Sequence, residues 1–183
     1  MKATVREESH DKCTYCESKI SHISPGHIEH LIPKSKRRDL VVCWQNLGYV
    51  CEECNREKGD YHEPDEPLLN PFIDNPEDHL LFFGPMILQK DLGKGYRTIR
   101  KLKLSRPSLV ERKKERIEYI QKLIVTWKSL PDSQTKQILK EEILGECRPD
   151  KEYSATIRNL LKQSLDWDIP AELPPKQLVQ LQL

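Results

Sequence analysis

The chain has 183 residues, of which 37% are hydrophobic and 32% are charged, and its formal net charge is +1. These values indicate a water-soluble protein of one or two domains and favour neither an acidic nor a basic partner. No apolar run approaches the roughly 20 residues that a membrane-spanning helix needs, and the N-terminal stretch MKATVREESHDK lacks the apolar core of a signal peptide. We therefore expect a cytoplasmic protein with no membrane partner.

Four of the six cysteines form two CxxC pairs, Cys13 with Cys16 and Cys51 with Cys54. In a reducing compartment such pairs are more often metal ligands than disulfides, and two of them complete a tetrahedral zinc site. The pairs are 34 residues apart, which is longer than the roughly 15 to 20 residues of a compact zinc ribbon. The sequence therefore predicts a structural zinc with further elements inserted between its two halves.

The inserted residues predict two strands and a helix. HIEHLIP is expected to form a short strand, SKRRD a basic loop and WQNLGYVC a second strand, while CEECNREKGD turns into a short helix. This N-terminal part, residues 1–62, is rich in cysteine and histidine, and we expect the metal rather than a large apolar core to organise it.

The remainder of the chain divides into a connector and a helical region. Residues 62–79 are dense in proline and acidic residues and predict a loop, and residues 80–90 predict two short strands around a Gly-Pro turn. A helix is expected from Ser105 to the proline at 131, with an apolar face, and two more helices over about 132–146 and 151–165. The face comprises Leu109, Ile117, Ile120, Leu123, Ile124 and Trp127. We thus expect a connector over 63–104 and a helical region over 105–183.

Charge is unevenly distributed, because residues 87–128 hold 13 basic and 4 acidic side chains. This block suits contact with phosphates, but "ERKKER" also offers ion pairs along a solvated helix face, and both interpretations stay open. The end of the chain, LVQLQL, places Leu178, Leu181 and Leu183 on one apolar stripe. That stripe is expected to dock on a partner, to close the protein's own helical core or to pair two identical chains.

The order of strand, basic loop, strand and helix between two CxxC pairs resembles the HNH, or ββα-metal, endonuclease family. Five stretches in sequence order carry the resemblance further: IEHLIPKS, WQNL, CEECNREKGD, PLLNPFIDNPEDHLLF and RTIRKLKLSRPSLVERKK. Together they resemble the PtuB-like HNH subunit of Septu-type and retron-linked anti-phage defence systems, and they span about residues 12 to 125. The resemblance implies an α+β fold, in which a zinc-stapled ββα-metal module precedes a mainly helical C-terminal region.

The family's site residues carry over by position. His30 matches the histidine that acts as general base, a task that suits an imidazole, and the preceding Glu29 matches the acidic ligand of the catalytic metal. Asn46 matches the middle residue of the motif, whose amide braces the loop that carries His30. Asn55 follows the second CxxC pair where many relatives have a histidine, so the motif here is HNN.

The implied catalytic ion is Mg²⁺ or Mn²⁺, since a carboxylate, an amide oxygen and waters suit a hard divalent cation. A further ligand is missing, because Gly59 stands where some relatives have another histidine, and Asp60 or His62 is a candidate for it. Four basic residues of the loop after the first strand are expected to grip the phosphate backbone without reading sequence. They are Lys34, Lys36, Arg37 and Arg38.

The resemblance implies a metal-dependent endonuclease that hydrolyses DNA phosphodiester bonds as the effector of an anti-phage complex with an ABC/AAA-type ATPase. Two other functions stay open: cleavage of RNA, and nucleic-acid binding by an inactive zinc-ribbon adaptor. Against the adaptor, the motif residues around the cysteines are intact. The sequence does not distinguish DNA from RNA and reveals no sequence specificity, trigger or stoichiometry.

Overall fold

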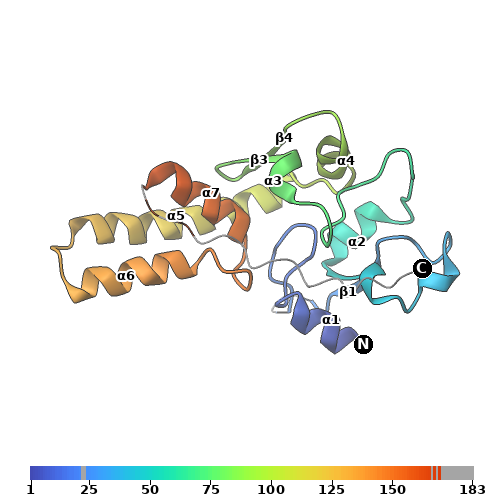
Figure 1. The fold of residues 1–183 in the computed structure, drawn as a ribbon, viewed down its shortest axis with the longest axis horizontal. Helices are drawn as coiled ribbons and strands as arrows, with labels where there is room; N and C mark the ends of the chain where they lie inside the picture. The colour runs from blue at the N-terminus through green and yellow to red at the C-terminus, as the bar shows by residue number, and fades with distance from the viewer. Residues whose placement is uncertain (22–23, 166, 168, 170–183) are drawn as a thin grey trace.

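The computed structural model describes residues 1–21, 24–165, 167 and 169. Within this part of the chain, helices alternate with two separate two-stranded sheets (Figure 1). The elements in chain order are α1 Lys2–Glu8, β1 His27–His30, the 3₁₀ helices η1 Arg38–Leu40 and η2 Trp44–Asn46, β2 Leu47–Val50, α2 Glu52–Lys58, α3 Pro76–His79, β3 Leu80–Phe83, β4 Met86–Gln89, α4 Lys94–Lys101, α5 Pro107–Ser129, α6 Gln134–Gly145 and α7 Ser154–Ser164.

The predicted strand–loop–strand–helix order of the N-terminal part is confirmed. β1 and β2 pair antiparallel, with Glu29 opposite Gly48 and His30 opposite Leu47. β2 is buried throughout, and α2 begins two residues after it and lies against β1. The sheet therefore fixes β1 beside α2, so that side chains from both elements can meet.

The strands and helices predicted for the later part of the chain are present. β3 and β4 form the expected hairpin, whose turn contains Gly84 in the left-handed region at φ 53°. α5 ends before the proline at 131, and α6 and α7 lie within the predicted ranges. Three α-helices were not predicted, namely α1, α3 and α4, and α3 falls within the predicted loop of 62–79. The strand predicted for WQNLGYVC is wrong for residues 44–46, which form η2 because the N–H of Asn46 turns back to the carbonyl of Cys43 at 3.0 Å. The predicted stripe of Leu178, Leu181 and Leu183 lies outside the described residues.

Two clusters of buried hydrophobic residues hold the fold together. The first joins α1, the cysteine loops and β2 to the β3–β4 hairpin, the start of α5 and Tyr153 just before α7. The second fills the space between the C-terminal half of α5, α6 and α7. The first cluster thus contains residues from all three predicted divisions of the chain, and the cysteine-rich part shares its core with the helices. The division itself stays a prediction.

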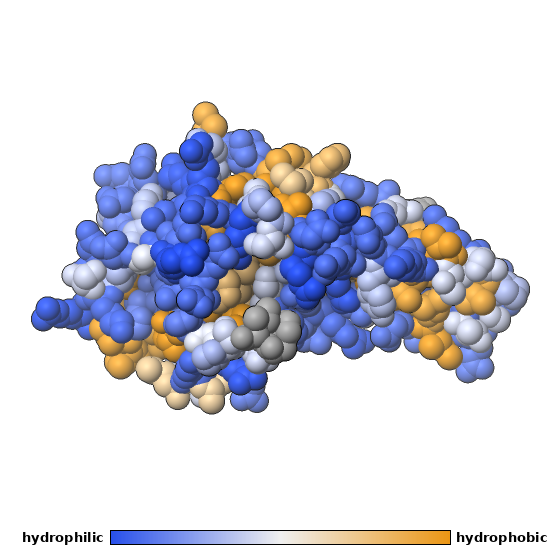
Figure 2. Space-filling view, turned by 180° about the vertical axis from the view of Figure 1, so that it is seen from behind, coloured by the Kyte–Doolittle hydropathy of each residue, from blue (hydrophilic) through white to orange (hydrophobic). Residues whose placement is uncertain are grey.

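The helix pair α5–α6 extends away from the rest of the molecule (Figure 1). Viewed from the opposite side, the surface is mostly hydrophilic, with hydrophobic residues gathered in patches that include the far end of this helix pair (Figure 2). Val125 on α5 and Ile138 on α6 are 68% and 58% exposed. No helix in the described ranges is long and apolar enough to cross a membrane.

The apolar face of α5 is confirmed, with one exception. Leu109, Ile117, Ile120 and Ile124 are buried as expected. Lys113 lies in the same stripe and is only 2% exposed. The interpretation of "ERKKER" as a solvated face is therefore wrong for Lys113, which α5 directs into the interior.

Candidate metal centre and nuclease site

The four cysteines of the CxxC pairs lie together, as predicted. Their sulfur atoms are all within 4.8 Å of one another, and three of the four residues are buried. Within the described residues this is the one group of three or more His, Cys, Asp or Glu side chains arranged so that it could hold a metal ion. The other two cysteines, Cys43 and Cys147, lie apart from it.

Local backbone contacts bring the two pairs together. The backbone N–H and hydroxyl of Thr14, within the first pair, donate to the carbonyl of Tyr49 on β2 at 2.9 and 2.8 Å. The second pair begins at the end of β2, where Cys51 caps α2 and its sulfur accepts from the N–H of Cys54 at 3.5 Å. β2 thus joins both halves of the cluster, although they are 34 residues apart in sequence.

The donor set fits zinc. Soft thiolate ligands in a closed tetrahedral arrangement are typical of structural zinc sites. Hydrogen bonds from the neighbouring thiols lower the pKa of Cys16 well below its ordinary value, whereas burial raises the pKa of Cys13. Hydrogen bonds within the cluster also lower the pKa of Cys51, so the four thiols differ in how readily they lose a proton, and a metal ion would be needed to keep all four deprotonated.

His30 is half-buried at the end of β1, and a backbone carbonyl orients its ring. The ring Nε2 lies 3.0 Å from the carbonyl oxygen of Val41. Because a carbonyl only accepts hydrogen bonds, Nε2 carries the proton of this bond, and the neutral ring presents its lone pair at Nδ1. This arrangement leaves Nδ1 able to accept a proton.

Asn46 is 5% exposed and braces the loop that follows His30. Its Oδ1 accepts from the N–H of Ile32 at 2.7 Å, and its Nδ2 donates to the carbonyls of Ile32 and Leu40 at 3.0 and 3.2 Å. Leu40 precedes Val41, so Asn46 fixes the segment whose carbonyl orients the imidazole. All three hydrogen bonds of the amide go to the backbone of this loop, which fits the predicted bracing role of Asn46.

Glu29 is buried and paired with a lysine that the sequence analysis did not single out. The Nζ atom of Lys58 lies 2.5 Å from Oε1 of Glu29 and donates to the carbonyl of His30 at 3.0 Å. Burial raises the pKa of Glu29 above its ordinary value, although Lys58 acts in the opposite direction. Lys58 therefore fixes the carboxylate and the backbone of the neighbouring histidine together.

The position of Lys58 carried a signal in the sequence. It is three residues after Asn55, which places the two on one face of α2. Asn55 is half-buried in the first turn of this helix. A buried carboxylate needs a cationic or hydrogen-bonding partner. Lys58, on the same face of α2 as the candidate ligand Asn55, could therefore have been considered as the partner of Glu29.

Asp60 and His62, the candidates for the missing metal ligand, do not form a cluster with Glu29 in the described part of the chain. Asp60 is exposed and His62 half-buried beyond the end of α2. Glu29 on β1 and the amide of Asn55 on α2, two elements that lie against each other, stay the predicted oxygen donors. One carboxylate with an amide fits a hard cation such as Mg²⁺ that keeps several waters and also binds substrate phosphate.

The basic loop that is expected to hold the phosphate backbone is exposed. Lys34, Lys36, Arg37 and Arg38 all face solvent. Arg37 forms a two-pronged ion pair with Asp39, at 2.8 Å from Nε to Oδ1 and 2.6 Å from Nη2 to Oδ2. Part of the charge of Arg37 is thus already balanced within the loop, and the other three cations are the more available to an anion.

Comparisons with known proteins agree with this geometry. The HNH endonuclease family model matches residues 13–61, which contain both CxxC pairs, β1, β2 and α2. The Septu protein PtuB of Bacillus thuringiensis is 33% identical over 182 residues, which cover 91% of this chain and 70% of that protein. The Septu protein PtuB of Bacillus mycoides strain KBAB4 is 29% identical over 143 residues, covering 61% of this chain and 48% of that protein. No solved structure matches significantly.

The fold and the matched motif define an HNH endonuclease, and HNH nucleases are metal-dependent enzymes. Within that class the chain belongs to the PtuB family of Septu proteins, as its identity over most of its length to a PtuB shows. The expectation of a defence-related HNH nuclease is thereby confirmed. The roles of individual site residues stay predictions.

We expect Cys54→Ser to remove the bound zinc and unfold the β1–β2–α2 part, because a structural zinc contributes on the order of 10 kcal/mol to folding. Elemental analysis and circular dichroism of the purified protein measure both effects. Cys147→Ser is the matched control, since Cys147 is also buried but lies outside the cluster. A folded Cys54→Ser protein without metal would contradict the prediction.

Proposed function

We propose that this protein hydrolyses phosphodiester bonds of DNA with a divalent metal ion, as the effector of an anti-phage defence complex. The observation that carries the proposal is the orientation of His30, whose Nδ1 is left as a proton acceptor by the hydrogen bond from Nε2 to Val41. The family match and the adjacent buried carboxylate of Glu29 support it.

Each site residue has a distinct task in this proposal. Nδ1 of His30 takes the proton of the attacking water, and Asn46 holds the loop that orients the ring. Glu29 and Asn55 hold the divalent ion, which when bound stabilises negative charge on the phosphate. Lys58 keeps the Glu29 carboxylate in place and adds a positive charge beside it.

The exposed basic loop makes a nucleic-acid backbone the favoured substrate. Lys34, Lys36 and Arg38 lie on the loop between His30 and Val41, whose carbonyl orients the His30 ring, and this supports the binding of a phosphate near that ring. Contacts of this kind position a phosphate chain and carry no sequence information. DNA and RNA share the phosphate backbone, so the basic loop does not distinguish between them. We choose DNA because of the family's role in anti-phage defence.

An ABC/AAA-type ATPase is the proposed partner. Val125 near the end of α5 and Ile138 near the start of α6 are exposed apolar residues, and they support a docking role for the helical region. A nuclease without sequence readout requires control, and an ATPase that changes state with nucleotide would supply it through different contacts in its two states. The partner would thus bind far from the nuclease site.

We expect His30→Ala to lower the rate of cleavage by roughly 10²- to 10⁴-fold, the range that general-base catalysis contributes. Zinc content and circular dichroism should not change, because His30 lies outside the cysteine cluster. His27→Ala is the matched control, since His27 is an exposed histidine on the same strand. Cleavage by His30→Ala at the unmodified rate would contradict the mechanism.

A substrate assay tests the choice of polymer and metal. The purified protein is incubated with plasmid, single-stranded DNA and tRNA, each with Mg²⁺, Mn²⁺ or a chelator. We expect cleavage of DNA that depends on the added ion and stops with chelator. Cleavage of tRNA alone would replace DNA by RNA as substrate, and cleavage of nothing in the presence of the partner would favour the inactive adaptor.

Co-expression with the proposed ATPase tests the partner. We expect the two proteins to elute together in size-exclusion chromatography, and we expect Val125→Asp with Ile138→Asp to weaken the complex, because a buried charge opposes an apolar contact. Lys128→Asp, a charged position on α5, controls for altered charge alone. Elution of the unmodified proteins as separate species would remove the partner from the proposal.

A further inference from the structure

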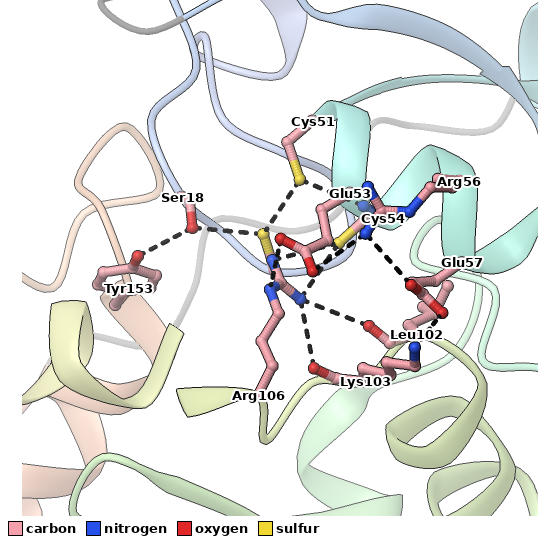
Figure 3. A network of polar contacts seen from close by, with 11 residues as sticks. Ser18, Cys51, Glu53, Cys54, Arg56, Glu57, Leu102, Lys103, Arg106 and Tyr153 are labelled. Carbon is pink, nitrogen blue, oxygen red and sulfur yellow. Dashed lines mark hydrogen bonds and ion pairs between the residues drawn. The ribbon is translucent and has the colours of Figure 1, made fainter. Parts of the chain in front are cut away.

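A cationic side chain at the N-terminal cap of α5 contacts the cysteine cluster, and a second one on α5 is linked to it through Tyr153 and Ser18. Arg106, the cap residue, has a side chain that is 11% exposed. Its Nη1 and Nη2 atoms are 3.9 and 3.8 Å from the sulfur of Cys54, so the guanidinium faces this sulfur with two N–H groups (Figure 3). Hydrogen bonds of this kind from a cation favour the thiolate over the thiol.

Lys113 is the second cation and lies deeper. Its ammonium forms no hydrogen bond with any residue of the described chain, and it lies 5.7 Å from the ring centroid of Tyr153. The hydroxyl of that tyrosine is 2.8 Å from Ser18 Oγ, which in turn is 3.3 Å from the sulfur of Cys16 (Figure 3). Burial lowers the pKa of Lys113 to about 8, while the charges of Glu17 and Cys16 oppose this shift.

A buried ammonium without a hydrogen-bonding partner is costly and calls for a compensating negative charge nearby. A Zn²⁺ ion held by four thiolates supplies one, because the thiolates outweigh the ion and leave a net negative centre. The positive charges of Arg106 and Lys113 would offset this net negative charge. Each cation also has one acidic neighbour: the charge of Glu17 acts on Lys113, and Glu53 Oε2 is 3.5 Å from Nε of Arg106 on the exposed side.

We propose that Arg106 and Lys113 are the counter-charges of the cysteine-bound zinc, so that helix α5 sets the affinity of the nuclease module for its structural metal. The inference rests on the zinc site proposed above. It makes the helical region necessary to the metal centre as well as to the core. The two residues are positioning residues that act through the thiolates.

A purely structural role for these side chains is the competing explanation. Arg106 also donates to the carbonyls of Leu102 and Lys103 at 3.4 and 3.3 Å, and these bonds close the turn before α5. Loss of that turn would lower stability without a specific effect on zinc. The test must therefore measure affinity for the metal, separately from folding.

Chelator competition on the full-length zinc-loaded protein measures that affinity. We expect Arg106→Gln and Lys113→Met to bind zinc roughly 10- to 100-fold more weakly, the range for loss of a residue that supports a metal ligand. Arg106→Lys should recover part of the loss because it keeps the charge. The matched controls are Arg112→Gln and Lys114→Met, which remove exposed cations from the same helix and should bind zinc normally.

If substitution of a buried cation prevents folding, a variant that is expected to bind zinc more tightly still tests the proposal. Glu53→Gln removes a half-exposed carboxylate beside Arg106 and should tighten zinc binding, because the centre then has one negative neighbour fewer. Zinc affinities of Arg106→Gln and Lys113→Met equal to those of the controls would overturn the inference, as would weaker binding by Glu53→Gln. Absence of zinc from the unmodified protein would instead overturn the proposed zinc site itself.

Discussion

The convergence of four sulfur atoms within 4.8 Å is the constraint on which the nuclease part depends. It fixes the loop after α1 against the start of α2, and β2 is held between them through the carbonyl of Tyr49. β1 is then placed by its pairing with β2, and this brings Glu29 over Lys58 on α2. The contact between Glu29 and Lys58 is therefore a consequence of the cysteine cluster at the opposite end of the same three elements.

Much of this arrangement could be predicted from the sequence because it depends on short-range patterns. CxxC spacing, the Gly-Pro turn and the apolar period of α5 each act within a few residues, and all three predicted features are present. Helix α4 escaped prediction because its sequence, KGYRTIRK, is mostly polar. Tertiary contacts hold this helix in place. At Gly95 it packs so closely on the backbone of His79 that a Cβ would lie 2.3 Å from that residue's carbonyl oxygen. The hydroxyl of Thr98 accepts a hydrogen bond from the N–H of Leu69 at 2.8 Å.

The site residues show the same limit. His30, Glu29 and Asn46 could be found from the family motif, whereas their partners could not. In the sequence, Lys58 and Lys113 do not differ from the many other lysines of charged helices. Both are buried in the structure because another part of the fold packs against their side of the helix. Pairing across elements is a property of the assembled fold, so a sequence pattern gives the position of such a lysine on its helix but does not give its surroundings.

The hydrogen bond that orients His30 ends on a main-chain carbonyl, and this has a consequence for how such a protein can vary. Any amino acid at position 41 provides the same carbonyl oxygen, so the bond itself places no demand on the side chain there. The bond instead requires that the loop between residues 30 and 41 has the right length and path to bring the carbonyl to the ring. A relative with an unrelated residue at position 41 would keep the bond, whereas a relative with one residue inserted in this loop would lose it.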